Sequence, residues 1–135
     1  MTKTKVFSLP VRVYFQDTDA GGVVYHANYL NFMERARTEW LRSYGHSNTG
    51  LMEEFGMVFV MRSVKLDYLK PALLDDALDV TAQIKDIGRS RLTLLQTVRR
   101  GDELLTEAEV HLVCVSLESF KPVSVPEVLR KRLQF

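Results

Sequence analysis

The segment from Tyr29 to Tyr44 limits what this chain can fold into. Its apolar residues recur at helical spacing, and at 100° per residue they fall on one contiguous arc that covers about half of the helical wheel. A helix on a protein surface usually shows an apolar stripe only somewhat wider than about 100°. We therefore expect this helix to be buried on more of its circumference than one flat contact would bury. The arc consists of Tyr29, Leu30, Phe32, Met33, Ala36, Trp40, Leu41 and Tyr44.

Segments with a two-residue period lie on both sides of this helix. Val11, Val13 and Phe15 form one face of a half-buried strand before it. Four more alternating segments follow it, and the short turns between them favour antiparallel neighbours. This order predicts an α+β fold in which an antiparallel sheet curls around one buried helix. The four later segments cover residues 58–68, 78–84, 92–98 and 104–117.

Two short helices complete the prediction. One covers about Asn48 to Phe55, and the other is basic and begins at Pro126-Glu127. The chain has 135 residues, of which 46% are hydrophobic, so its length is close to that of one domain with a real core. Because no repeat, linker or low-complexity stretch divides it, we expect residues 1–135 to form one domain.

The charge balance and the apolar runs exclude several classes of protein. Eighteen Lys and Arg residues against seventeen Asp and Glu leave +1, too little positive charge for non-specific binding of nucleic acid. The longest apolar run, Met57 to Met61, is far shorter than the roughly 18 to 20 residues of a membrane-spanning helix. Residues 1–10 contain too few apolar residues for an export signal. Since the single Cys114 also suits a reducing compartment, we expect a cytoplasmic protein.

The densest polar segment, residues 17–26, lies between the end of the first strand and the start of the buried helix. The first N–H groups of a helix lack intrahelical partners, and with the positive end of the helix dipole they can polarise a carbonyl or hold an oxyanion. A carboxylate from Asp17 or Asp19, brought back by the glycine pair that follows, would face the same carbonyl. This pairing favours acyl transfer or hydrolysis.

Two other interpretations apply to the same segment. Asp17 and Asp19 can serve as turn and cap residues, which is the more frequent role of an isolated D-x-D-x-G pattern. A calcium loop is the second interpretation, and it fails on its ligands. Gly21 stands where the fifth-position ligand belongs, and Asn28 stands where a glutamate closes the loop.

Three further groups of residues were candidates for a site. His111 and Cys114 project to opposite faces of an alternating strand, so they cannot hold one metal ion. Arg37 lies inside the apolar arc and needs a partner, and Glu34, one turn earlier, is the nearest candidate for an ion pair or a site. A basic cluster near Gly88 is either a solvated surface or a site for a phosphate-bearing substrate. It consists of Lys85, Arg89, Arg91, Arg99 and Arg100.

Two stretches of the sequence match a known family. The stretch from Tyr14 to Tyr29, YFQDTDAGGVVYHANY, resembles an active-site signature, and Phe32 to Arg37, FMERAR, resembles the helix that follows it. Further matches continue as far as Lys121-Pro122, so the resemblance covers nearly the whole chain. The family is the 4-hydroxybenzoyl-CoA thioesterase-like branch of the hotdog-fold thioesterases. Within it, the chain is most similar to the bacterial Tol-Pal system-associated acyl-CoA thioesterases.

The resemblance implies a hotdog fold, an acyl-CoA thioesterase activity and a set of site residues. Asp19 matches the catalytic carboxylate of the family, which acts as nucleophile or as general base on water, and Asp17 does not match it. His26 matches the position whose backbone N–H polarises the thioester carbonyl. The loop that makes room for the substrate matches Gly22, Val23 and Tyr25. Basic residues near a strand turn hold the coenzyme A nucleotide in the family, and these match Gly88, Arg89, Ser90 and Arg91.

The resemblance also implies partners and an assembly. It implies no metal and no cofactor, because hydrolysis of a thioester needs only water, a base and an oxyanion site. The substrate is an acyl-CoA, with acyl carrier protein as the other candidate carrier of the acyl group. A homodimer joined edge to edge through its sheets, or a homotetramer, has its active sites at the subunit interface. Two rival functions stay open, a non-catalytic acyl-carrier or acyl-chain binding protein and a hotdog dehydratase.

Overall fold

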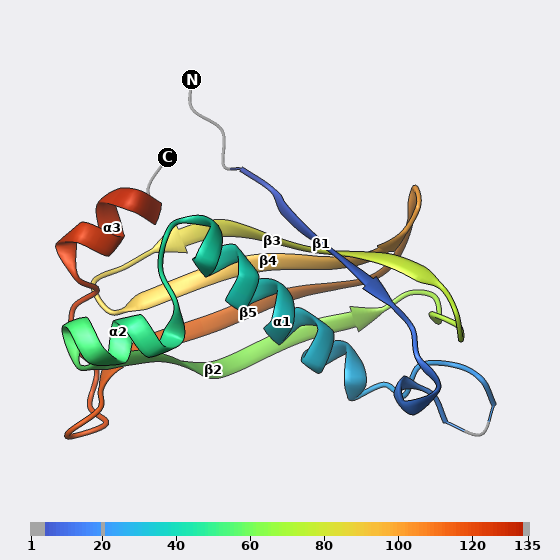
Figure 1. The fold of residues 1–135 in the computed structure, drawn as a ribbon, viewed down its shortest axis with the longest axis horizontal. Helices are drawn as coiled ribbons and strands as arrows, with labels where there is room; N and C mark the ends of the chain where they lie inside the picture. Colours follow the sequence, from blue (N-terminus) through green and yellow to red (C-terminus); the bar gives the residue numbers. More distant parts are fainter. Residues whose placement is uncertain (1–4, 20, 134–135) are drawn as a thin grey trace.

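The computed structural model describes residues 5–19 and 21–133 (Figure 1). Residues 1–4, part of the segment in which we expect no export signal, and Ala20 of the active-site signature lie outside the described residues. The elements in chain order are β1 (Phe7–Arg12), the 3-10 helix η1 (Phe15–Asp17), α1 (Asn28–Ser43), α2 (Asn48–Phe55), β2 (Met57–Tyr68), β3 (Ala77–Ile87), β4 (Arg91–Arg100), β5 (Glu103–Ser116) and α3 (Glu127–Leu133).

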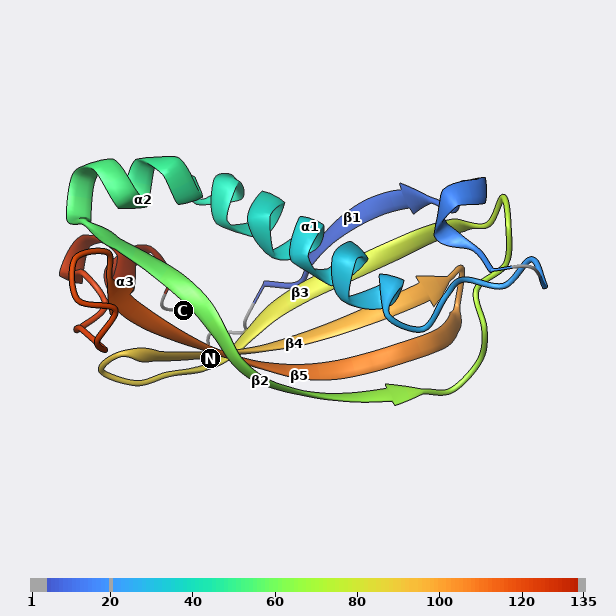
Figure 2. The ribbon, with the colours of Figure 1, turned by 90° about the horizontal axis from the view of Figure 1, so that it is seen from below.

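The strands form one antiparallel sheet in the order β1-β3-β4-β5-β2. Figure 2 shows the sheet curving beneath α1, which lies along its concave side. Both the α+β class and the hotdog architecture are therefore confirmed. The register shifts at Met61/Ser63 in β2 and at Ile84/Asp86 in β3, and such bulges bend a strand and increase its twist. Within residues 5–19 and 21–133, no helix combines the length and hydropathy needed to cross a membrane.

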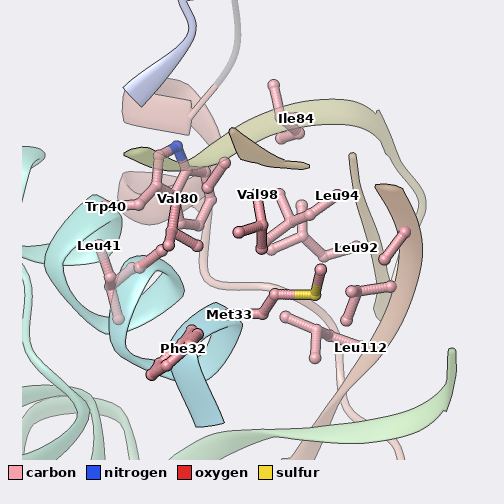
Figure 3. Packing of buried hydrophobic residues seen from close by; sticks show 14 of the residues in the cluster. Phe32, Met33, Trp40, Leu41, Val80, Ile84, Leu92, Leu94, Val98 and Leu112 are labelled. Atoms are coloured by element: carbon pink, nitrogen blue, oxygen red, sulfur yellow. The ribbon is translucent and has the colours of Figure 1, made fainter. Parts of the chain in front are cut away.

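Burial of α1 follows the apolar arc that the sequence predicts. The side chains that face the sheet are packed against residues of β3, β4 and β5 (Figure 3). Leu30 and Tyr44 also belong to the arc but are only partly buried, and Tyr44 follows the last residue of α1. The apolar arc of α1 is wide because the curved sheet contacts the helix over much of its circumference. The buried residues of α1 are Tyr29, Phe32, Met33, Ala36, Trp40 and Leu41.

The first strand differs from the prediction. Val11 and Val13 are buried as the alternation requires, but β1 ends at Arg12, and Phe15 lies in η1 with 78% of its surface exposed. The strand also contains Pro10, which lacks a backbone donor. This is tolerated because β1 is an edge strand of the sheet, with β3 as its one partner among the residues that the structure describes.

The partner of Arg37 also differs from the prediction. Its Nη1 donates to Oε1 of Gln96 at 3.0 Å, whereas Glu34 was the expected partner. Gln96 is fully buried on β4, and its Nε2 donates to the carbonyl oxygens of Met33 at 3.0 Å and Thr81 at 3.2 Å. Burial lowers the pKa of Arg37, and the charge of Glu34 opposes that shift. A polar bridge between α1 and the sheet therefore satisfies the one cation inside the apolar arc.

Phe32→Ala should destabilise the protein by about 3–5 kcal/mol, because removing this fully buried ring leaves a cavity between α1 and the sheet. Urea unfolding followed by circular dichroism measures this change. Phe120→Ala makes the same substitution at a turn residue that is 67% exposed, so it should change stability by no more than about 0.5 kcal/mol. Equal losses for the two variants would contradict the packing described above.

Candidate active site

The loop before α1 is held against the segment that joins β2 to β3. The Val24 N–H donates to the Ala72 carbonyl at 2.9 Å, and the Leu74 N–H donates to the Gly22 carbonyl at 3.0 Å. Gly22 adopts φ of +77°, a left-handed conformation that costs glycine little and strains other residues. The loop therefore turns tightly at Gly22 and is anchored at Gly22 and at Val24.

The two aspartates of this loop have different environments. Asp17 is only 6% exposed, and its carboxylate accepts hydrogen bonds from the Tyr14 N–H and from Asn28 Nδ2, each at 2.8 Å. Asp19 is exposed, and its Oδ1 accepts from the Gly21 N–H at 2.9 Å. The interpretation as a structural cap thus describes Asp17, which links η1 to the first turn of α1. Asp19 keeps a carboxylate that solvent or a ligand can reach.

The backbone at His26 presents a donor at the start of α1. The Tyr25 carbonyl, in the same peptide group as the His26 N–H, accepts from the Asn28 N–H at 2.8 Å. A hydrogen bond accepted by a peptide carbonyl polarises the N–H of that peptide. Among the described residues, no atom accepts a hydrogen bond from the His26 N–H. This N–H can therefore donate to a ligand at the positive end of the helix dipole.

A surface depression of about 280 Å³ adjoins His26. Tyr29 and Tyr68 line it, and their rings meet at a centroid distance of 5.3 Å with a tilt of 66°. The Tyr29 hydroxyl accepts from the Ala72 N–H at 2.9 Å, and burial raises its pKa despite this hydrogen bond. The remaining lining residues are Val24, Leu69, Lys70 and Pro71, so Asp19 lies outside the depression in one chain.

The turn between β3 and β4 lies at the other end of the sheet from this loop (Figure 1). Here Arg89 Nε donates to Ser124 Oγ at 2.9 Å, and the Arg130 guanidinium donates to the carbonyls of Gly88 and Arg89. The Ser90 carbonyl accepts from the Cys114 N–H. Within one chain, the structure therefore does not bring Gly88 to Arg91 together with Asp19 and His26.

The basic cluster expected around Gly88 is also divided. Arg91 begins β4 and Arg100 ends it, so about nine steps of roughly 3.3 Å separate their backbones. Arg100 is paired with Asp76 at 2.6 Å and with Glu103 at 2.7 Å. The expectation of one cluster is therefore wrong for Arg99 and Arg100. Of the five residues, Lys85, Arg89 and Arg91 are near the turn, at the end of β3, in the turn itself and at the start of β4.

The other sequence candidates give no site in the structure. Cys114 is buried, and its burial raises the pKa of the thiol to about 11, while His111 is partly exposed beside Glu109. In the described part of the chain, no group of three or more His, Cys, Asp or Glu residues could hold a metal ion.

Sequence reasoning missed Tyr68 as a site residue. Its alternation with Leu66 and Val64 predicts a strand, and the structure places it at the end of β2, where it lines the depression beside His26. The useful signal was an aromatic residue with a polar end directly before the turn at Lys70-Pro71.

Asp17→Ala should destabilise the protein by about 1–3 kcal/mol, because it leaves two part-buried donors without an acceptor. Asp19→Ala removes one exposed hydrogen bond and should cost less than about 1 kcal/mol. Denaturant unfolding of the two variants measures both values. A larger loss for Asp19→Ala than for Asp17→Ala would reverse the assignment of the structural carboxylate.

Comparisons with known proteins agree with this architecture. Residues 13–133 match the model of the thioesterase-like superfamily. The chain is 44% identical to the acyl-CoA thioesterase YbgC of Haemophilus influenzae, over 92% of this chain and 91% of that protein. It is 46% identical to the acyl-CoA thioester hydrolase YbgC of Escherichia coli, over 92% of each. A probable thioesterase from Bartonella henselae superposes with a TM-score of 0.86 at 34% identity, over 90% of this chain and all of that one. The chain belongs to the thioesterase-like superfamily.

Proposed function

We propose that the protein is an acyl-CoA thioesterase, which hydrolyses an acyl thioester to a free acid and the coenzyme A thiol. The observation that carries the proposal is the His26 N–H at the start of α1, which has no acceptor within residues 5–19 and 21–133. It lies in the same anchored loop as the exposed Asp19 carboxylate. Relatives of more than 40% identity carry the names acyl-CoA thioesterase and acyl-CoA thioester hydrolase, which supports the same substrate class.

The two groups have complementary roles in the proposed reaction. The His26 N–H donates to the thioester oxygen and stabilises the negative charge that develops there. Asp19 acts by one of two routes. As a general base it removes a proton from the attacking water, or as a nucleophile it forms an acyl anhydride that water then cleaves. In both routes the C–S bond breaks and the thiolate leaves with a proton from water.

Asp17 is unsuited to either role. Both of its carboxylate oxygens accept hydrogen bonds from the protein, and the side chain is buried. A substrate would have to displace Tyr14 or Asn28 to reach it. Asp19 is therefore the carboxylate assigned to the reaction.

Asp19→Asn should lower kcat for thiol release by about 10²- to 10⁴-fold, because an amide can act neither as base nor as nucleophile. The assay uses a panel of short-chain, long-chain and aromatic acyl-CoA esters. Asp102→Asn, an identical change on an exposed turn, should keep the wild-type rate.

The products of this assay separate the rival functions. Retention of the acyl-CoA without thiol release would favour a non-catalytic acyl-binding protein. An unsaturated product with its thioester intact would favour a dehydratase. Thiol release that does not depend on Asp19 would remove the proposed site while leaving the activity.

The proposal extends to a dimer with a coenzyme A site shared between chains. Strand β2 has one partner, β5, and its other edge is unpaired among the described residues. An antiparallel pairing of β2 with its copy lays the Met57 end of one strand beside the Tyr68 end of the other. The β3–β4 turn lies at the Met57 end, because Arg91 pairs with Val113 and Met57 with Ser116. The Arg89 and Arg91 side chains of one chain would then approach Asp19 of its partner.

Mixed dimers test this arrangement. The dimer to be measured combines one Asp19→Asn chain with one Arg91→Gln chain and is isolated with two affinity tags. If each site takes Asp19 from one chain and Arg91 from the other, one of its two sites keeps both wild-type residues. If each site lies within one chain, neither site keeps both. We expect half of the wild-type kcat with an unchanged KM for acyl-CoA, whereas the Arg91→Gln homodimer should show a KM raised about tenfold. A raised KM in the mixed dimer would place both residues of the site in one chain, and a monomeric protein would contradict the dimer itself.

Three finer proposals follow from the family resemblance. Acyl carrier protein is the second candidate donor of the acyl group, and the dimer can pair again into a tetramer. The reaction takes place in the cytoplasm, in association with the Tol-Pal system. Comparing hydrolysis of the same acyl group on coenzyme A and on acyl carrier protein distinguishes the two carriers.

A further inference from the structure

We propose that Tyr68 is a positioning residue for the electrophilic backbone of the active site, an inference that rests on the proposed thioesterase function. Tyr68 ends β2, and its hydroxyl donates to the His26 carbonyl oxygen at 2.6 Å. The two residues are 42 positions apart in the sequence, so only the fold brings them together. Tyr68 therefore connects the sheet directly to the first residues before α1.

The atom that Tyr68 binds is one that the helix itself does not use. The carbonyls on either side of it accept from α1: the Tyr25 carbonyl receives the Asn28 N–H at 2.8 Å, and the Ala27 carbonyl receives the Leu30 N–H at 3.2 Å. The His26 carbonyl receives the Tyr68 hydroxyl instead. This bond holds the peptide group between His26 and Ala27 in one orientation. Its polarisation also adds to the positive potential at the start of the helix.

Two fixed peptide groups define the direction of the His26 N–H. The group before the Cα of His26 is held by the bond from the Asn28 N–H to the Tyr25 carbonyl at 2.8 Å. The group after it is held by the Tyr68 hydroxyl. Because both planes meet at this Cα, loss of either anchor lets the His26 N–H rotate away from the thioester oxygen. The donor strength of an oxyanion site depends on such preorganisation.

The ring of Tyr68 is itself held in place. It meets the His26 imidazole edge-on at a centroid distance of 6.4 Å and the Tyr29 ring at 5.3 Å. Tyr29 in turn receives the Ala72 N–H, and the Ala72 carbonyl receives the Val24 N–H. Burial, followed by the neighbouring Tyr29, raises the pKa of the Tyr68 hydroxyl, so it stays a donor at neutral pH. Strand end, helix start and loop thus meet at one cluster of aromatic rings.

Tyr68→Phe removes the hydrogen bond and keeps the ring contacts. We expect kcat for acyl-CoA hydrolysis to fall about 5- to 20-fold with KM changed less than twofold, because the donor is misdirected but not lost. Tyr44→Phe is the matched control. It removes a hydroxyl beside Trp40 at the far end of α1, where the ring contact would remain, and should leave both constants unchanged.

The carbonyl stretching frequency of a bound thioester reports the positioning directly. Infrared difference spectra of a ¹³C-labelled acyl-CoA bound to Asp19→Asn should show a lowered frequency, because the His26 N–H polarises the carbonyl and turnover is blocked. In Asp19→Asn/Tyr68→Phe this lowering should be smaller. A merely structural role for Tyr68 would change the melting temperature without moving the frequency.

The outcomes separate this inference from the proposed function. If Tyr68→Phe leaves both kcat and the carbonyl frequency unchanged, the positioning role is overturned. A raised KM with an unchanged kcat would also overturn it, because that result indicates a contact between Tyr68 and the substrate. If the wild type binds the thioester without hydrolysing it, the proposed function fails and the spectra still decide the inference. A frequency shift that depends on Tyr68 then supports the positioning, and one that does not depend on it overturns the positioning.

Discussion

Burial of α1 in the concave side of the sheet is the interaction on which the rest of the structure depends. An apolar arc over half of a helix needs a curved partner, and the bulges in β2 and β3 help a five-stranded sheet to supply one. The single cation inside this contact is tolerated because Gln96 accepts from it and bonds to the backbone on either side. Helix and sheet therefore share one hydrophobic core.

The position of α1 decides where chemistry can occur. The helix begins beside Tyr68, at the edge of the sheet. Hydrogen bonds of the Val24 and Leu74 N–H groups connect the preceding loop to the β2–β3 connection. The helix dipole, the His26 N–H and the exposed Asp19 carboxylate consequently meet in one short loop. Asp17 contributes differently, because its two hydrogen bonds link η1 to the first turn of α1.

The two ends of the sheet divide the candidate residues. The loop at Asp19 lies at one end, and the basic turn at Arg89 lies at the other, where Ser124 and Arg130 hold it. A ten-residue strand such as β4 is roughly 30 Å long, so side chains at its two ends cannot reach one another within one chain. The outer edge of β2, which pairs with no strand in the described part of the chain, offers the geometric solution, because an antiparallel copy reverses the ends. Catalysis and substrate binding would then depend on the same strand edge that joins the subunits.

The sequence by itself determined the elements and their order, since periods of two and 3.6 residues reflect local backbone geometry and burial. The same periods predicted where the helices begin and end. The resemblance carried by residues 14–29 and 32–37 singles out Asp19. Tertiary structure alone decided the rest. The local pattern does not show that Asp17 also receives a hydrogen bond from Asn28, 11 positions away. Nor does it select Gln96 over Glu34 for Arg37, because Gln96 is 59 positions away. The contact between Tyr68 and His26 likewise arises only when the sheet closes around the helix.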